Sequence, residues 1–271
     1  MDQKEANRRI VVKVGTSTLT RENGSINLRR MDQLACTISD LKGMGYEMIL
    51  VTSGAIAVGA AKLGMAQRPS ELRVKQAAAA VGQCEMMHRY DKFFGEYNQT
   101  VAQILLTGED VKDSDRAEHL HRTFEALLEL GCIPIVNEND SVSSAEIETG
   151  TAKILGDNDT LSAVVASLCG ADLLILLSDI NGLYSEDPRT NPDATLIHRV
   201  NAVTPALHAM AGGAGTPNGT GGMTTKLTAA ETAMAAGVDM VITNGEHIGK
   251  IYDIIAGKEI GTRFFARKQT M

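Results

Sequence analysis

The sequence has no tryptophan, and only 4% of its 271 residues are aromatic. It has no run near the ~20 consecutive apolar residues that a helix needs to cross a bilayer, so we expect no membrane-spanning segment. The N-terminal residues are polar and lack the apolar centre of a signal peptide, which predicts a cytoplasmic protein. The 26 basic and 33 acidic residues give a net charge of −7, which disfavours a nucleic-acid-binding protein, because such proteins usually have a basic face.

Metal-binding spacings are also missing. The four cysteines are Cys36, Cys84, Cys132 and Cys169. No two of them form a CxxC motif, and each has apolar neighbours, so we expect reduced cysteines inside the core. His119 and His121 are close in sequence, but a spacing of two places them on different faces of a helix. The sequence therefore predicts no zinc site.

The common nucleotide fingerprints are absent as well. No GxxxxGK[ST] motif occurs, which excludes a P-loop enzyme, and no GxGxxG follows the first apolar run, which disfavours a dinucleotide site. The sequence does contain 26 glycines against 6 prolines, a balance that favours tight turns over loose linkers.

Short apolar runs alternate with helix-length segments along the chain. Six runs predict strands, at 9–14, 46–52, 101–106, 132–136, 172–177 and 238–243. Six segments predict helices, at 28–44, 53–63, 74–94, 115–130, 160–169 and 223–236. Nearly continuous apolar strands are typical of a sheet buried on both faces, so the pattern predicts an α/β fold around a mostly parallel sheet. No low-complexity linker divides residues 1–271, and we expect a single domain. The alanine-rich stretch 73–81 predicts close packing, within the core or against another subunit.

Small or polar residues follow four of the predicted strands, at 13–17, 52–55, 137–140 and 178–182. Ligands of open α/β sheets collect at these strand ends, and glycine turns before helices present backbone N–H groups to anions. A further glycine turn at 220–226 opens a helix and places Lys226 in its first turn. A lysine there is unfavourable for the helix dipole unless an anion is bound, so the pattern favours a phosphate loop over a flexible loop with a solvated lysine.

Three charged positions add to this indication. Lys13 lies within an otherwise apolar strand, and a buried lysine is rare unless it is paired; an edge strand with the lysine facing water is the alternative. Asp157 and Asp159 stand close together at the start of a helix, where two carboxylates repel unless a cation compensates them. Lys13, Lys226 and this acidic pair predict a phosphoryl-transfer site.

Seven segments carry a resemblance to a known family. They are, in order, VVKVGTSTL (11–19), VTSGAIAVG (51–59), QAAAAVGQ (76–83), PIVNENDSV (134–142), GDNDTLSA (156–163), LLSDINGLYSEDPR (176–189) and GTGGMTTK (219–226). Together they resemble the amino acid kinase family, most closely its glutamate-phosphorylating members. The resemblance implies a three-layer αβα sandwich. It also implies ATP-dependent phosphorylation of the L-glutamate γ-carboxylate to L-glutamyl 5-phosphate, the first step of proline biosynthesis.

The resemblance implies how the phosphoryl group would be handled. Lys13 and Lys226 would neutralise the transferring group, and Asp159 would hold both lysines in place. The γ-carboxylate is already ionised at pH 7, so no general base is needed. Mg²⁺ would be bound mainly through the phosphates of ATP, with no protein metal site. The nucleotide would contact Lys13, Gly15, Ser178, Asp179, Thr220, Gly221, Gly222, Met223, Thr224, Thr225 and Lys226.

The resemblance also implies a binding site for L-glutamate. The substrate would contact Ser53, Gly54, Asn137, Asp140, Asp157 and Asn158. Within this set, Asp140 would receive the ammonium group, while Asn158 and Ser53 would bind a carboxylate. Gly15 and Gly54 would supply backbone N–H groups near the γ-phosphate.

Regulation and assembly follow from the same resemblance. It implies feedback inhibition by proline, a homodimer or homotetramer, and a functional coupling to the next pathway enzyme, because an acyl phosphate is labile. The segment 141–155, where proline would act, is longer than the family pattern leads us to expect. The chain ends at Met271, so we expect no C-terminal PUA domain.

Two alternative functions stay open. One is another member of the family, such as an acetylglutamate, aspartate or uridylate kinase; the segments NEND and GDND argue against it. The other is a non-catalytic small-molecule sensor on the same scaffold. Such a sensor should lack one of the phosphoryl-handling lysines, yet both are present.

Overall fold

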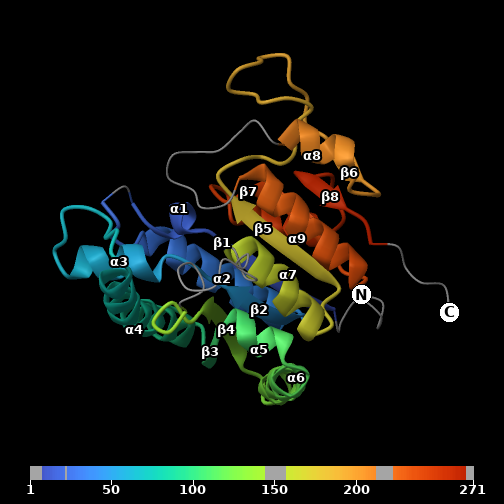
Figure 1. Ribbon diagram of the computed structural model, residues 1–271. Helices are drawn as coiled ribbons and strands as arrows, with labels where there is room; N and C mark the ends of the chain where they lie inside the picture. The colour runs from blue at the N-terminus through green and yellow to red at the C-terminus, as the bar shows by residue number, and fades with distance from the viewer. Residues whose placement is uncertain (1–7, 22, 144–156, 212–221, 267–271) are drawn as a thin grey trace.

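A single eight-stranded sheet forms the centre of the molecule (Figure 1). The computed structural model describes residues 8–21, 23–143, 157–211 and 222–266. The strands are β1 (Arg9–Val14), β2 (Glu47–Val51), β3 (Val101–Leu106), β4 (Ile133–Glu138), β5 (Leu173–Ser178), β6 (Arg199–Val200), β7 (Asp239–Asn244) and β8 (Thr262–Phe264). They lie in the order β3-β4-β2-β1-β5-β7-β8-β6. All of these pairings are parallel except the antiparallel pairing of β7 with β8.

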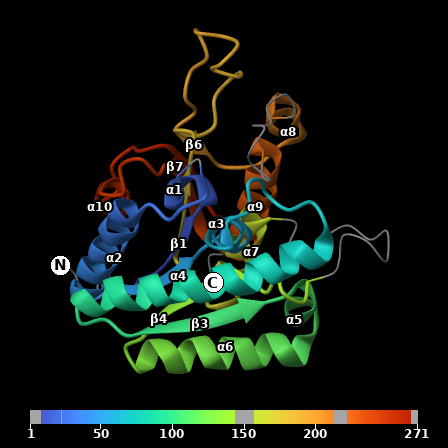
Figure 2. The same cartoon turned by 90° about the vertical axis from the view of Figure 1, so that its left-hand side faces the viewer.

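Helices cover both faces of the sheet (Figures 1 and 2). They are α1 (Thr16–Leu19), α2 (Leu28–Gly43), α3 (Ala55–Lys62), α4 (Leu72–Glu96), α5 (Gly108–Lys112), α6 (Ser114–Glu129), α7 (Asn158–Leu168), α8 (Pro205–Ala211), α9 (Met223–Ala235) and α10 (Lys250–Ile255). The six predicted strands and the six predicted helices are confirmed within a few residues at each end. The remaining elements, α1, α5, α8, α10, β6 and β8, are each at most seven residues long and were not predicted.

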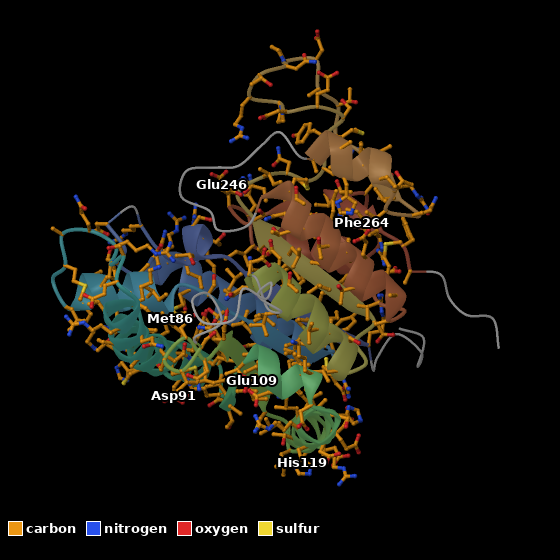
Figure 3. The ribbon with its side chains drawn as sticks, in the orientation of Figure 1. Met86, Asp91, Glu109, His119, Glu246 and Phe264 are labelled. Carbon is orange, nitrogen blue, oxygen red and sulfur yellow. The ribbon has the colours of Figure 1, made fainter. Side chains whose placement is uncertain are left out.

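The central strand β1 shows why the sheet needs two helical layers. Val12 and Val14 belong to the core cluster that also contains residues of α2, α4 and α10. Val11 faces the opposite way, into a cluster with residues of α7 and α9. Met86 on α4 and Phe264 on β8, both labelled in Figure 3, belong to these two different clusters. The three-layer αβα sandwich around a mostly parallel sheet is therefore confirmed.

Helices α3 and α4 make an unusually close contact (Figure 2). A Cβ atom built on Gly59 would lie 1.8 Å from the carbonyl oxygen of Ala78, and one built on Gly82 would lie 1.8 Å from that of Ala55. Neither position has room for a side chain. The close packing predicted for the alanine-rich stretch is thus found within the chain, against α3.

The prediction of core cysteines is wrong for two of the four. Cys36 and Cys84 are exposed, Cys132 is half-buried and Cys169 is buried. Apolar neighbours in sequence misled the prediction, because the helical repeat of α2 and α4 turns Cys36 and Cys84 outward. Burial raises the pKa of the Cys169 thiol to about 12. Of the helices that the structure describes, none combines the length and the apolar character needed to cross a membrane.

Candidate active site

The candidate site lies at the C-terminal ends of the parallel strands. β4, β2, β1 and β5 are adjacent and parallel, so the turns that follow them meet at one edge of the sheet. The turn after β2 contains Gly54, whose φ of 100° is readily adopted only by glycine. A Cβ atom on Gly54 would lie 3.1 Å from Cγ2 of Thr16. The turns after β1 and β2 are therefore in contact.

Lys13, Asp159 and Lys226 form the charged centre of the site. Lys13 Nζ lies 2.6 Å from Asp159 Oδ1, and Lys226 Nζ donates a hydrogen bond to Asp159 Oδ2 at 2.9 Å. The side chains are nearly removed from solvent, with exposed fractions of 11% for Lys13, 3% for Asp159 and 7% for Lys226. β1 lies between β2 and β5, which excludes the alternative that Lys13 stands on an edge strand.

The charge state of Asp159 follows from two opposing effects. Burial alone would raise the pKa of this carboxyl, because a low-dielectric surrounding disfavours the charged form. The nearby charges of Lys13 and Lys226 outweigh burial and hold the pKa of Asp159 below its usual value. Two ammonium groups and one carboxylate leave one net positive charge on these three side chains. Such a buried cluster suits an anionic ligand.

A chain of side-chain amides lies beside the charged centre. Asn158, next to Asp159 in α7, donates through Nδ2 to the carbonyl oxygen of Thr52 at 2.7 Å and to Asn137 Oδ1 at 3.1 Å. Asn137, at the end of β4, donates through Nδ2 to Gln83 Oε1 on α4 at 2.9 Å. The sequence reasoning proposed Asn137 and Asn158 but no role for Gln83. Its signal was its position as the last, polar residue of QAAAAVGQ (76–83), one of the seven segments that carry the family resemblance.

Two further predicted residues stand near the turn after β1. The Ser53 hydroxyl donates to the carbonyl oxygen of Val14 at 3.2 Å and lies 3.2 Å from the Thr16 hydroxyl. A Cβ atom on Gly15 would lie 3.7 Å from Lys13 Nζ, so the Gly15 backbone passes close to the catalytic candidate. These small residues keep the backbone accessible beside the lysine.

The two acidic residues near the amide chain differ in their surroundings. Asp157 caps α7 by accepting a hydrogen bond from the Thr160 backbone N–H at 2.8 Å. Its second oxygen, Oδ2, is buried without a hydrogen-bond partner among the described residues. Asp140 lies half-buried in the turn after β4. Asp157 thus serves as a helix cap and keeps one acceptor for another group.

The predicted nucleotide residues divide between two strand-helix junctions. Ser178 ends β5, and its hydroxyl donates to the exposed Asp179 at 3.1 Å. Gly222 precedes α9, where no side chain caps the first turn of the helix, so its N–H groups suit an anion. Met223, Thr224, Thr225 and Lys226 form the first turn of α9. Thr220 and Gly221 lie outside the described residues.

No group of three or more His, Cys, Asp or Glu side chains within the described ranges is arranged to hold a metal ion. Asp159, the most central carboxylate, has both oxygens directed to lysines. The arrangement is suited to neutralising an anion with fixed cations.

Comparisons with known proteins identify the family of the chain. The model of the amino acid kinase family matches residues 8–244. A glutamate 5-kinase of Clostridium perfringens is 53% identical over 261 residues, covering 96% of this chain and 96% of that protein. A glutamate 5-kinase of Listeria monocytogenes is 52% identical, covering 97% of this chain and 94% of that protein.

Solved structures share the fold at low sequence identity. The carbamate kinase from Giardia lamblia bound to AMP-PNP has a TM-score of 0.68 at 16% identity, over 96% of this chain and 99% of that chain. The UMP kinase from Ureaplasma parvum has a TM-score of 0.63 at 14% identity, over 96% and 99% of the two chains. These likenesses concern the fold alone.

Proposed function

The chain belongs to the amino acid kinase family, and we propose that it transfers the γ-phosphoryl group of ATP to the γ-carboxylate of L-glutamate. The observation that carries this proposal is the pair of buried lysines held by Asp159 at the strand ends. The product would be L-glutamyl 5-phosphate, which places the enzyme at the first step of proline biosynthesis. The relatives named glutamate 5-kinase support the choice of glutamate over the other family substrates.

The proposed reaction needs positioning and charge neutralisation. A γ-carboxylate oxygen attacks the terminal phosphorus of ATP, a new P–O bond forms, and the bond to the bridging oxygen breaks to release ADP. Lys13 and Lys226 stabilise the charge on the transferring phosphoryl group. Asp159 stays ionised throughout, because the lysines hold its pKa low, and it keeps both ammonium groups in place. The first turn of α9, where Gly222 provides no capping side chain, would bind nucleotide phosphates through its backbone N–H groups.

Mg²⁺ fits the site only as a companion of the nucleotide. Both oxygens of Asp159 pair with lysines. Among the described residues, no three His, Cys, Asp or Glu side chains are grouped to coordinate a metal ion. Mg²⁺ commonly binds through substrate phosphates and few protein groups. When bound to ATP, it would neutralise charge on the phosphates.

The substrate end of the site supports an amino acid ligand. We assign Asp140 to the substrate ammonium, and Ser53, Gly54, Asn137, Asp157 and Asn158 to the surrounding contacts. These residues lie at the end of β4, in the turns after β2 and β4, or at the start of α7, on the same edge of the sheet as the charged centre. Ser178 ends β5 and Asp179 follows it, on the other side of β1, where the nucleotide would lie.

Several finer proposals rest on the family membership. We propose feedback inhibition by proline, a homodimer or homotetramer, and functional coupling to the enzyme that consumes the labile acyl phosphate. The segment assigned to proline falls largely on residues 144–156, which lie outside the described residues. Residues 8–244 match one family model and share one sheet, which supports a single catalytic domain. The use of ATP and glutamate suggests the cytoplasm as its location.

The direct test is the trapping of the acyl phosphate with hydroxylamine. We expect hydroxamate formation that requires L-glutamate, ATP and Mg²⁺, and that proline reduces. N-Acetylglutamate, aspartate and UMP should give no comparable ATP consumption. Preference for any of these three would overturn the proposed substrate, and no ATP turnover with any acceptor would favour the sensor alternative.

The role of Lys226 is tested by Lys226→Ala, with Lys258→Ala as a matched control. We expect the first variant to lose at least ~10²-fold in kcat, the effect of removing a preorganised transition-state contact. Lys258 is exposed and pairs with Asp253, so its substitution should leave kcat unchanged. Near-normal turnover by a folded Lys226→Ala protein would contradict the proposed role.

The role of Asp140 is tested by the Michaelis constants for the two substrates. Asp140→Ala should raise KM for glutamate at least ~10-fold, because a charge-assisted contact to the ammonium is lost. The KM for ATP should change much less. An equal rise in both constants would remove Asp140 from the ammonium subsite.

A further inference from the structure

Gln83 lies on α4 and has a buried hydrogen-bond donor without a partner. The residue is 8% exposed, and its Oε1 accepts a hydrogen bond from Asn137 Nδ2. Nε2 is buried and has no hydrogen-bond partner among the described residues. Leaving such a donor unsatisfied costs ~1–3 kcal/mol, so an unpaired buried amide calls for a missing acceptor.

The orientation of this amide is fixed by its neighbours. The carbonyl oxygen of Thr52 can only accept, so Asn158 must direct Nδ2 toward it. The same Nδ2 donates to Asn137 Oδ1, which forces Asn137 Nδ2 toward Gln83 Oε1. Exchanging nitrogen and oxygen in any one amide would bring two donors or two acceptors together. The Thr52 carbonyl, through Asn158 and Asn137, therefore determines that the unpaired atom of the Gln83 amide is the donor Nε2.

The amide chain thus has two chemically different ends. Both hydrogens of Asn158 Nδ2 are used, so that residue has only Oδ1, an acceptor, left to offer a ligand. Gln83 offers only a donor at the other end. An α-amino acid carries the complementary pair, an ammonium that donates and a carboxylate that accepts. Asn158, which has only an acceptor left, would therefore contact the substrate ammonium. The family resemblance had instead implied that Asn158 binds a carboxylate.

We propose that Gln83 binds the α-carboxylate of the substrate through Nε2 and so selects an amino acid whose α-carboxyl group is free. The inference rests on the proposed function, in which the γ-carboxylate lies at the lysines. Asn158 is adjacent in sequence to Asp159, whereas Gln83 is separated from Asn158 by Asn137. Gln83 therefore lies toward the non-reacting end of the substrate.

The test is Gln83→Glu, assayed with L-glutamate and with its α-amide. The substitution keeps an acceptor for Asn137 but replaces the donor with an anionic oxygen. We expect KM for L-glutamate to rise at least ~10-fold, because the attraction between Nε2 and the α-carboxylate is replaced by repulsion between two carboxylates. KM for ATP should stay within about twofold. The α-amide can donate to the new carboxylate. The preference of the wild type for glutamate over its α-amide, as a ratio of kcat/KM values, should therefore fall at least ~10-fold.

A matched control separates this effect from a change of stability. Gln99→Glu makes the same substitution just after α4, where Gln99 Oε1 accepts from Lys42 at 2.8 Å, at the opposite end of the sheet. It should leave both KM values and the substrate preference unchanged. If Gln83→Glu does not fold, Gln83→Met provides the second variant. It removes the donor without adding charge, and should also reduce the preference for glutamate.

The outcomes distinguish this inference from the proposed function. An active wild type together with a folded Gln83 variant of unchanged substrate preference overturns the inference alone. An equal loss with both substrates indicates a purely structural role for Gln83 and also overturns it. A wild type that phosphorylates neither substrate overturns the proposed function and the inference together.

Discussion

Asp159 pairs with two lysine side chains in a buried place that by itself disfavours its charged carboxylate. Each ammonium group loses most of its hydration, and the shared carboxylate compensates both of them. The cluster is consequently more useful for binding an anion than for stability, since buried ion pairs often contribute little net stabilisation.

Asp159→Asn should destabilise the protein by ~3–5 kcal/mol, because it leaves two buried ammonium groups without their carboxylate. Urea denaturation at pH 7 measures this change. Asp193 is exposed, and Asp193→Asn should change stability by less than ~0.5 kcal/mol. Equal changes in the free energy of unfolding for the two substitutions would show that pairing with Asp159 does not stabilise the folded protein.

The same carboxylate predicts a specific pH dependence of stability. Its pKa is lowered in the folded state, so its contribution is fully present above the unfolded value of ~3.9 and is lost as pH falls through the folded pKa. The stability difference between the wild type and Asp159→Asn should stay constant from about pH 7 to 5 and shrink below about pH 4. A difference that already declines near neutral pH would contradict the lowered pKa.

The sequence predicted the role of a single residue only where that residue type is uncommon in the predicted strand or helix. Lys13 within an apolar strand and the paired acids at the start of α7 both indicated the charged centre. Gln83 escaped because glutamine is unremarkable in a helix, and its role depends on Asn137, which comes from a distant strand. Cys36 and Cys84 were misplaced because sequence neighbours do not report which face of a helix is buried.

At the scale of elements, the contact between α3 and α4 positions the turn that begins with Ser53. α3 starts directly after Gly54, so any displacement of α3 by α4 is passed to that turn. The glycines at the contact allow two backbones to approach as closely as the structure shows.

Gly82→Ala should destabilise the protein by ~1–3 kcal/mol or more, because the added methyl group meets a backbone carbonyl. Gly95, on the same helix, has nothing within 4 Å of the position that an added methyl group would take. Gly95→Ala should therefore stabilise by up to ~1 kcal/mol, the ordinary gain of alanine over glycine in a helix. Thermal unfolding of both variants checks the prediction, and a tolerated Gly82→Ala would show that the contact can loosen.

Strands and helices were predicted correctly where the apolar residues showed a regular pattern over the length of the element. The continuous apolar runs and the 3.6-residue repeats identified the major strands and helices. β6 and β8 are two and three residues long, which is too short to show any alternation. β8 pairs with β7 on one side and with β6 on the other, so both short strands form only because the rest of the sheet is in place.

At the scale of the whole molecule, one threonine joins the last strand to a distant segment. The segment between β5 and β6 projects beyond the sheet in both views (Figures 1 and 2). Its two ends meet at Thr262 on β8, whose hydroxyl accepts from the Leu183 N–H at 2.8 Å and donates to the Ile197 carbonyl at 2.6 Å. The side chain of Thr262 is fully buried.

Thr262→Val keeps the shape of this side chain but removes the hydroxyl, so the buried Leu183 N–H and the half-buried Ile197 carbonyl lose this partner. We expect a loss of roughly 1–3 kcal/mol in unfolding free energy and faster hydrogen exchange at the Leu183 amide. Thr228→Val removes an exposed hydroxyl on α9 and should have little effect on either measurement. Unchanged exchange at Leu183 would show that another group holds the segment.

The two lysines of the charged centre are far apart in the sequence, and this has a consequence for synthesis on the ribosome. β1 emerges first and carries Lys13, whereas α9, with Lys226, follows the emergence of most of the sheet. Chains are made from the N-terminus, so a nascent protein contains Lys13 and Asp159 long before the second cation arrives. Under the proposed function, which needs both lysines, a chain that ends before α9 would lack one of the two cations and should not transfer the phosphoryl group of ATP.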